Sequence, residues 1–346
     1  MRLALFSFIA PLFCSAITYA NPLNLYMWED TLSPNVIDQW QQQSSTPLRL
    51  DHFDNDDKRS LLMLRSDQLP FDVVVLDNVS AQIYGRLNMF EDLTDLPNRQ
   101  HNAAKWNQVC GTHAVPYFWG TVGIAFRHSA VKHPPATWHD FVYPPQEHEG
   151  KIGMINDSIE SFLPLFYALD LSPIEDNPDT LQKAYPQLIE FSDRVLTFEY
   201  ILSYIRSQAD ANALDMALAY SGDQYSLNRF YGEGKWGFVI PEGQLFIWVD
   251  CLAIPKSSTN KDAAKAFVNF LMDPNIAAIN ATDIKAATPN LSALKLLPEW
   301  YINDASLFPE SSRVEGALID SELTAANISL RAKIINSILK RHEAQH

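Results

Sequence analysis

The sequence has few cysteines, few basic residues and, after its first twenty residues, no long apolar run. Its three cysteines, Cys14, Cys110 and Cys251, lie too far apart in sequence to form a paired-cysteine zinc motif. No later segment reaches the roughly 18 uncharged apolar residues that a membrane span needs. The chain also lacks a Walker phosphate loop, a GxSxG elbow and an HExxH motif. No local motif therefore argues for an enzyme, although a catalytic triad is a spatial arrangement that needs none.

Acidic residues outnumber basic residues by 41 to 26, and the formal net charge is -15 at pH 7. This balance disfavours nucleic acid as a partner and favours cationic partners through long-range attraction. An acidic surface that serves only to keep the protein soluble would give the same composition. A hydrophobic content of 47% is ample for globular packing, and 346 residues suit two domains better than one.

The first twenty residues have the pattern of a secretory signal peptide. Arg2 supplies the positive start, residues 3–17 form an apolar segment, and Thr18-Tyr19-Ala20 offers a small-x-Ala cleavage site. Cys14 does not indicate a lipoprotein anchor, because the preceding Phe13 is too bulky for such a signal. We therefore expect cleavage near Ala20 and a soluble mature protein that is exported to the periplasm.

Two cysteines, Cys110 and Cys251, remain after cleavage. An oxidising compartment permits a disulfide between them. Two isolated buried thiols would give the same sequence pattern, so both interpretations stay open.

Short apolar runs alternate with helical patterns along the chain, which favours an α/β fold. We expect strands at residues 23–26, 48–53, 71–76, 114–119, 122–126, 151–155, 216–220, 236–240 and around Trp248. We expect helices that begin at Ser33-Pro34 and that cover residues 58–65, 160–169, 180–191, 261–272 and 330–341. The proline-rich residues 127–150 are interpreted as a crossover between two α/β blocks, and Asp273-Pro274 as a helix stop.

The most informative segment is Phe246-Ile247-Trp248-Val249-Asp250-Cys251-Leu252-Ala253-Ile254-Pro255. Alternate side chains of a strand share one face, so Trp248 and Asp250 are predicted to lie side by side. An aromatic face and a carboxylate both attract an organic ammonium group. The alternative is a core tryptophan next to a solvated aspartate at a strand end.

Four further segments place acidic or aromatic residues at the ends of predicted strands. They are Trp28-Glu29-Asp30, Asp77-Asn78, Asn156-Asp157-Ser158-Ile159-Glu160 and Tyr220-Ser221-Gly222-Asp223. Ligands of α/β sheets bind beyond the carboxyl ends of strands, where these segments should lie. Helix capping by Asp157 or Ser158, with Glu160 in the first turn, explains one segment but not the recurrence.

On these and other residues, the chain resembles the periplasmic polyamine-binding proteins, the spermidine and putrescine receptors of bacterial uptake systems. The resemblance covers about residues 23–300. Its markers are Leu25-Tyr26-Met27-Trp28, Phe71-Asp72-Val73-Val74-Val75, Val115-Pro116-Tyr117-Phe118-Trp119-Gly120, residues 248–255 and Thr288-Pro289-Asn290-Leu291, which are specific only in combination.

The resemblance implies a type II, flytrap fold, in which hinge strands join two α/β lobes that close on a ligand in the cleft between them. Residues 21–126 with 250–290 would form the N-terminal lobe, and residues 127–249 with 291–346 the C-terminal lobe. We expect a monomer that needs no cofactor and holds no metal.

Carried over position by position, the resemblance also implies a ligand site. The residues of its aromatic box would be Trp28, Tyr220 and Trp248. The partners of ammonium groups would be Asp157, Glu160, Asp223 and Asp250, with Asp30 and Asp77 next to further contact positions. Some spermidine receptors have tyrosines where this chain has Thr31, Val79 and Ala286, so the length of the ligand stays open.

The chain is also similar to a sensor branch of this family, which reports norspermidine or spermidine to an inner-membrane protein that makes or degrades cyclic di-GMP. The similar segments are His52-Phe53-Asp54-Asn55-Asp56-Asp57, residues 221–230 and residues 331–337. We therefore expect a polyamine sensor that affects biofilm through a partner of the GGDEF/EAL type. The alternative is the substrate-binding component of an ABC uptake transporter with a permease as partner, because both roles need the same pocket.

Two other classes of function stay open. A binding-protein scaffold can carry an enzyme, because fold does not fix function, but the sequence offers no nucleophile or metal motif for one. A metal receptor could use Asp157, Glu160 and Asp250 as oxygen ligands, although a metal ion gains nothing from neighbouring indole rings.

Overall fold

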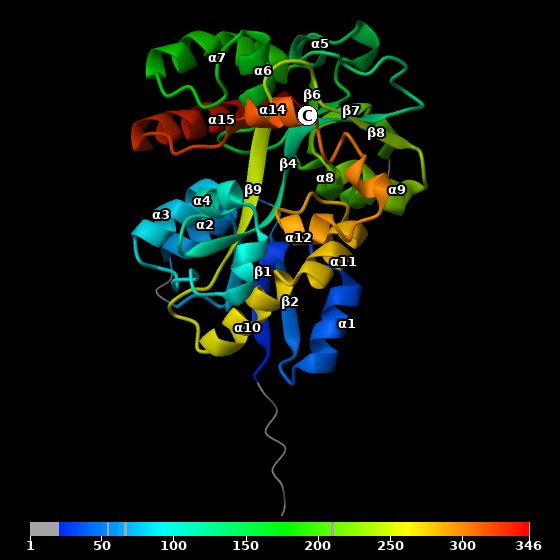
Figure 1. Ribbon diagram of the computed structural model, residues 1–346. Helices are drawn as coiled ribbons and strands as arrows, with labels where there is room; N and C mark the ends of the chain where they lie inside the picture. Colours follow the sequence, from blue (N-terminus) through cyan, green and yellow to red (C-terminus); the bar gives the residue numbers. More distant parts are fainter. Residues whose placement is uncertain (1–20, 54, 66–67, 209–210, 346) are drawn as a thin grey trace, which may run out of the picture.

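The computed structural model describes residues 21–53, 55–65, 68–208 and 211–345. The predicted signal peptide, residues 1–20, lies outside these residues. Figure 1 shows two lobes of helices and strands, one above the other, with long strands running from one lobe into the other. The expected fold of two α/β lobes joined by hinge strands is confirmed.

All strands of the described residues belong to one sheet, in which the order is β2-β1-β3-β9-β4-β7-β5-β6, with β10 next to β9 and β8 next to β4. The strands are β1 (Leu23–Trp28), β2 (Leu48–Phe53), β3 (Val73–Asp77), β4 (Ala114–Arg127), β5 (Ile152–Gly153), β6 (Val195–Thr197), β7 (Met216–Tyr220), β8 (Trp236–Val239), β9 (Phe246–Ala253) and β10 (Leu318–Ile319). Strands β1, β2 and β3 are parallel, whereas β9 is antiparallel to both β3 and β4.

The hinge strands are β4 and β9 (Figure 1). Two strands were predicted at residues 114–119 and 122–126, and this prediction is wrong, because β4 is one strand of 14 residues. Gly120 and Thr121 interrupt the apolar pattern, but both pair with β9 and keep the strand extended. Beyond them β4 pairs with β7 and β8, so one strand serves both lobes.

Helices cover the sheet on both sides. The α-helices are α1 (Pro34–Gln43), α2 (Asp56–Arg65), α3 (Asn78–Arg86), α4 (Ala104–Cys110), α5 (Trp138–Val142), α6 (Leu163–Ala168), α7 (Pro178–Ser192), α8 (Ile201–Ser207), α9 (Asp223–Tyr231), α10 (Lys261–Leu271), α11 (Pro274–Ile284), α12 (Leu291–Leu294), α13 (Glu299–Ile302), α14 (Ser311–Glu315) and α15 (Ala325–Gln345). The 3-10 helices are η1 (Pro97–His101), η2 (Gln146–His148) and η3 (Ala211–Ala213). Within the described ranges, no helix combines the length and the apolar character that crossing a bilayer requires.

The first lobe has a core on each side of its strands. Val73 and Val75 of β3 pack against α1, α10 and α11, whereas Val74 and Leu76 pack against α3 and α4. Burial of each of these side chains contributes roughly 1.5–3 kcal/mol to folding. The alternation explains why this strand has an unbroken apolar sequence, as predicted for a strand that is buried on both faces.

Several predicted boundaries need correction. Residues 127–150 are not only a crossover, because Thr137 and Asp140 form a capping box that starts α5. The predicted helix at residues 160–169 starts later, at Leu163, because a turn precedes it. Asp273-Pro274 ends α10, but it also starts α11, since the Asp273 carboxylate accepts a hydrogen bond from the amide of Asn275.

The lobe boundaries stay a proposal. Four residues beyond the predicted boundary at residue 290, namely Ala293, Leu297, Tyr301 and Leu307, pack into the core that β1 and α10 share. This packing favours a first lobe that extends to about residue 308.

A disulfide joins Cys110 at the end of α4 to Cys251 in β9, with the two Cα atoms 5.8 Å apart. Both residues are buried. The bond therefore ties a helix of the first lobe to the strand that carries Trp248 and Asp250.

Candidate functional site

A cleft between the lobes is lined by residues from both. The space between the lining atoms is about 1100 Å³, including the part that opens to solvent. Residues 28–31 begin at the last residue of β1, residues 220–223 join β7 to α9, and residues 246 and 248–250 belong to β9. Strand ends from the two lobes thus converge on one cleft, as the pattern of the sequence predicts.

Aromatic rings form a chain through the cleft. The ring of Trp28 packs on Phe53 at a centroid distance of 4.6 Å and lies 6.2 Å from Tyr200 of the other lobe. Tyr220 lies 5.8 Å from Tyr200 and 6.0 Å from Trp248. These rings give the cleft π surfaces that attract organic cations.

The ring of Trp248 lies directly over Gly120 in β4. A Cβ atom at Gly120 would come within 2.5 Å of the ring, and it would also overlap the hydroxyl of Ser221. The indole nitrogen of Trp248 is buried and has no hydrogen-bond partner among the described residues. Close packing on a glycine, rather than a hydrogen bond, therefore fixes this ring.

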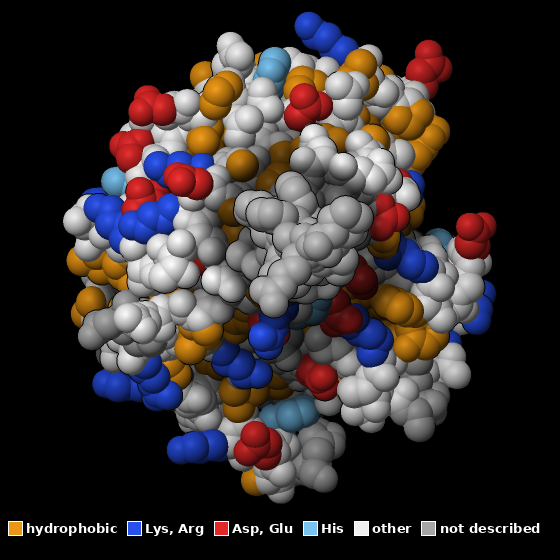
Figure 2. Space-filling model, turned by 90° about the horizontal axis from the view of Figure 1, so that it is seen from below, with side chains coloured by type: hydrophobic (Ala, Val, Ile, Leu, Met, Phe, Trp, Pro, Cys, Tyr) orange, Lys and Arg blue, Asp and Glu red, His pale blue; other side chains and the backbone are white. Residues whose placement is uncertain are grey.

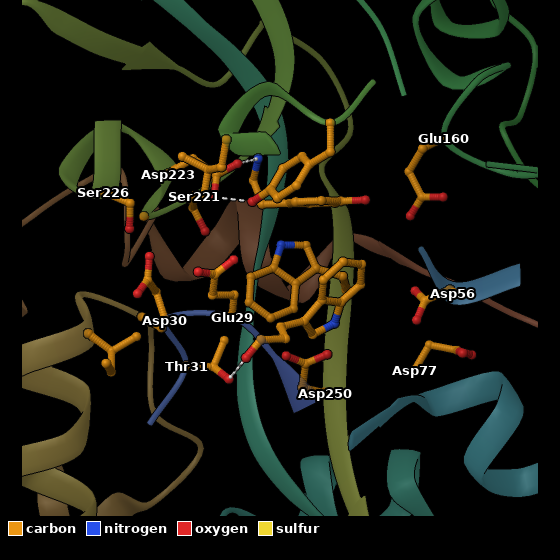
Figure 3. A pocket seen from close by; sticks show the side chains of 18 of the residues that line it. Glu29, Asp30, Thr31, Asp56, Asp77, Glu160, Ser221, Asp223, Ser226 and Asp250 are labelled. Carbon is orange, nitrogen blue, oxygen red and sulfur yellow. Dashed lines mark hydrogen bonds between the residues drawn. The ribbon is translucent and has the colours of Figure 1, made fainter. Parts of the chain in front are cut away.

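Carboxylates dominate the charge of the cleft. Within the described residues, eight of them line it, against the two basic side chains of Arg206 and Lys285. The eight are Glu29, Asp30, Asp56, Asp77, Glu160, Asp223, Asp250 and Asp320. Figure 3 shows Glu160, Asp56 and Asp77 on one side of the aromatic rings and Glu29, Asp30 and Asp223 on the other.

The outer surface has a different distribution of charge. Figure 2 views the molecule from below, and basic and acidic side chains are interspersed on this face. The face has no uniform acidic surface, although the chain has a net charge of -15. The cleft, by contrast, is lined by four times as many acidic as basic side chains within the described residues.

Burial raises the pKa values of four carboxyl groups in the cleft. It raises the pKa of Asp223 to about 7 and that of Asp320 to about 8. Burial also raises the pKa values of Glu160 and Asp250 well above their ordinary range, and Asp157 next to Glu160 raises the latter further. Burial thus favours the neutral forms of these groups, whereas a cationic ligand favours their ionised forms.

Asp157 is not among the residues that line the cleft. One of its carboxylate oxygens accepts hydrogen bonds from the amides of Ile159 at 2.7 Å and Glu160 at 3.2 Å. Asp157 therefore shapes the turn that carries Glu160, which is the capping role that the sequence left open. Its direct contact with a ligand stays a prediction.

Asp223 holds two aromatic residues in place. Its carboxylate accepts a hydrogen bond of 2.6 Å from the hydroxyl of Tyr200 and one of 2.8 Å from the amide of Tyr220. Both oxygens are therefore engaged within the protein, and the position of this residue suits orienting the rings.

The buried Arg59 compensates two of the carboxylates. Its guanidinium donates to the carboxylate of Asp56 and, at 2.6 Å, to that of Asp77. Asp77 and Asp250 are directly opposite each other on β3 and β9, and such like-charged neighbours repel. Arg59 relieves this repulsion, because it neutralises Asp77.

Three other carboxylates of the cleft have no basic side chain as an ion-pair partner among the described residues. In the part of the chain that the structure describes, no lysine or arginine makes an ion pair with Glu160, Asp250 or Asp320. A buried carboxylate without a counter-ion is unfavourable unless it is protonated or meets a cation. The cleft is thus built to receive positive charge.

The profile of the bacterial extracellular solute-binding protein family matches residues 54–309, which is more than half of the chain. This chain belongs to that family. A norspermidine sensor from Vibrio cholerae serotype O1 is 53% identical over 323 residues, which cover 93% of this chain and 90% of the relative. The putrescine-binding periplasmic protein SpuD from Pseudomonas aeruginosa is 27% identical over 83% of each chain.

Solved structures share the fold of this solute-binding protein. A Listeria monocytogenes protein described as a spermidine/putrescine ABC transporter superimposes with a TM-score of 0.82 over 93% of this chain and all of its own, at 23% identity. A substrate-binding protein of a spermidine/putrescine ABC transporter from Streptococcus pneumoniae gives a TM-score of 0.75 at 19% identity, over 93% of this chain and all of its own.

The cleft of this solute-binding protein gathers most of the predicted site residues. Those that line it are Trp28, Asp30, Asp77, Glu160, Tyr220, Asp223, Trp248 and Asp250, together with Thr31 and Ala286. Val79, like Asp157, does not line it.

Other lining residues were missed in the sequence, including Phe53, Tyr200, Arg206 and Asp320. Tyr200 follows β6 and Asp320 follows β10, so both obey the rule that ligands gather at strand ends. These strands have only three and two residues, which is too short for a recognisable pattern.

Proposed function

We propose that this protein is a periplasmic polyamine receptor of the spermidine and norspermidine class. The observation that carries the proposal is a set of unpaired carboxylates, on Glu160, Asp250 and Asp320, within one aromatic cleft. A polyamine is a flexible methylene chain with separated ammonium groups. It therefore suits a site with carboxylates at intervals and flat rings along its stem.

Several contacts must act together in such a site. Each contact between a ring and a cation contributes roughly 0.5–2 kcal/mol. Ordering a flexible ligand costs about 0.5–1.5 kcal/mol for each immobilised unit. The chain of rings from Trp28 to Trp248 offers several such contacts within one cleft.

The alternative of a metal receptor has less support. No group of three or more histidine, cysteine, aspartate or glutamate side chains gathers for metal binding in the described ranges. A metal ion would also gain nothing from the aromatic walls. We further propose a binding role without a catalytic step and a monomeric state.

We propose that the protein senses polyamine in the periplasm, after signal cleavage near Ala20, and regulates an inner-membrane partner of the GGDEF/EAL type, with an effect on biofilm. The relative that is named a norspermidine sensor supports this role, at 53% identity. The second candidate is the binding component of an ABC uptake transporter. More distant relatives that are named putrescine-binding or spermidine/putrescine-binding proteins support it, at 22–27% identity.

Thermal unfolding of the purified, ligand-free protein tests the binding function. Putrescine, norspermidine, spermidine and spermine would each be titrated separately. A ligand at 100 times its dissociation constant should add about 2.7 kcal/mol to the free energy of unfolding. We expect a saturable rise in melting temperature with at least one of the triamines. No rise with any polyamine would contradict the proposal.

Deletion of the gene separates the two roles. We expect the deletion strain to lose the change in cyclic di-GMP that polyamine produces and to retain uptake of labelled polyamine. Lost uptake with an intact cyclic di-GMP response would instead favour the transporter role.

A further inference from the structure

We propose that Arg206 is an internal cation that limits the length of the polyamine in the cleft, so that a triamine binds better than a tetra-amine. This inference rests on the proposed polyamine function. It assigns a specificity role to a residue that the sequence did not indicate.

The guanidinium of Arg206 bridges the two lobes. Its Nη1 atom lies 2.7 Å from a carboxylate oxygen of Glu29 and 3.9 Å from one of Asp30. Both acids belong to the loop after β1, whereas Arg206 belongs to α8 of the other lobe. Its Nε atom donates to the carbonyl of Leu202, and its guanidinium lies 5.6 Å from the ring centroid of Phe230. Arg206 is therefore held in one place.

This ion pair lies at the end of the cleft that holds Glu29, the one exposed carboxylate among the described lining residues. Figure 3 shows Glu29 and Asp30 on the opposite side of the aromatic rings from Glu160. The side chain of Glu29 is 52% exposed, and that of Arg206 is 27% exposed. A ligand that is longer than the buried part of the cleft would extend toward this end.

The carboxylates set how many ammonium groups the cleft can hold. Glu160 and the neighbouring Asp320 share one end of the cleft, Asp250 lies between the ends, and none of the three has an ion-pair partner among the described side chains. At the outer end, an oxygen of Asp30 is buried and has no hydrogen-bond partner within the described residues, because Arg206 is too distant to donate to it. Asp30 thus remains available to the outermost ammonium of a triamine.

A further ammonium group would meet Arg206. The next carboxylate outward is Glu29, which Arg206 already neutralises. A fourth ammonium must therefore displace the guanidinium from Glu29 or remain next to a like charge, and both options weaken binding. The other basic lining residue, Lys285, places its ammonium on the carbonyl of Thr282 and over the ring of Trp300, neither of which lines the cleft.

Calorimetric titration with norspermidine and spermine tests this inference on wild type and on Arg206→Gln. We expect the substitution to raise the ratio of spermine affinity to norspermidine affinity about tenfold, which equals about 1.4 kcal/mol. Arg206→Lys retains the cation and should keep the ratio of the wild type. Arg229→Gln removes an exposed positive charge from α9, outside the cleft lining, and controls for net charge.

Two results would overturn the inference. An equal change in affinity for both amines would show that Arg206 only holds the lobes together, and an unchanged ratio would show that it does not sense ligand length. In either case the binding of norspermidine by the wild type would leave the polyamine function intact. Failure of the wild type to bind any polyamine would remove both proposals.

Discussion

Asp250 is a buried carboxylate in β9, opposite another aspartate and without an ion-pair partner in the described residues. Burial and the nearby Asp56 disfavour its charge, and only Arg59 at longer range opposes them. This residue has little reason to be acidic for the sake of stability. A cation that enters the cleft would stabilise its negative charge.

We expect Asp250→Asn to lower polyamine affinity at least tenfold, or about 1.4 kcal/mol, because it removes one charged contact. The melting temperature without ligand should not fall, because a neutral amide replaces a group whose charge burial disfavours. Trp248→Ala should also strongly lower polyamine affinity. Calorimetry and thermal unfolding check both variants, and Asp51→Asn, at an exposed position in β2, is the matched control. Unchanged affinity in both cleft variants would mean that the assigned pocket is wrong.

The raised pKa values of Asp223 and Asp320, about 7 and about 8, predict a dependence on pH. They exceed the ordinary value near 4, so the native state holds more protons than the unfolded chain from about pH 4 to pH 8. These groups therefore make the ligand-free protein less stable as pH rises through this window. Affinity for a cationic ligand should change in the opposite direction and increase from pH 5 to pH 8, as the carboxyl groups ionise.

Calorimetry at pH 7 in two buffers with different ionisation enthalpies should detect release of protons on binding. The Asp51→Asn variant should release as many protons as the wild type. An affinity that stays constant from pH 5 to pH 8 would contradict the assignment of these carboxyl groups to the ligand site.

At the scale of elements, helix α15 supports the turn that carries Glu160 through the buried Arg331. The guanidinium of Arg331 donates to the carbonyls of Ser158 at 3.3 Å and Pro173 at 2.7 Å. It also donates to Asn327 one turn earlier and lies over the ring of Phe162. One side chain thus joins the last helix of the chain to the turn that carries Glu160.

We expect Arg331→Lys to lower the free energy of unfolding by about 3 kcal/mol, because a lysine cannot satisfy these acceptors in one plane and a buried network is broken. Polyamine affinity should also fall, since the turn at Ser158 loses its donor. Denaturant unfolding and calorimetry measure the two effects. Lys333→Gln, on the exposed face of the same helix, should change neither quantity. Full affinity in Arg331→Lys would show that the turn holds its shape alone.

How far the sequence predicts these elements depends on their length. Trp248 and Asp250 were placed on one face because β9 is long enough for its alternation to be read. The residues after β6 and β10 were missed because strands of three and two residues have no readable period. Strand β4 was divided in two because the glycine that admits the ring of Trp248 interrupts its apolar pattern. Arg206 was missed because nothing in a helix sequence shows which charge will face a partner from another lobe.

At the scale of the whole molecule, the disulfide between Cys110 and Cys251 closes a loop with a sequence separation of 141 residues. In the chain-entropy account, a loop of this size contributes about 5 kcal/mol to stability by restricting the unfolded chain. We expect the double variant Cys110→Ser with Cys251→Ser to lose a stability of this order in urea. Thiol counting of the unfolded, unreduced wild type provides the control. Two reactive thiols in that sample, or a double variant as stable as the wild type, would contradict the bond.

The order in which the lobes can fold follows from their interleaved strands. The core around β1, near the start of the described chain, includes Phe267 and Leu307, and the core on the opposite side includes Val249 and Cys251 of β9. Neither core can close until more than two hundred further residues have emerged, and contacts so distant in sequence form slowly. A chain that must pass through a membrane channel before it folds gains from this delay. In the proposed export, the strands that join the two lobes thus also keep the newly made polypeptide unfolded until it has crossed the membrane.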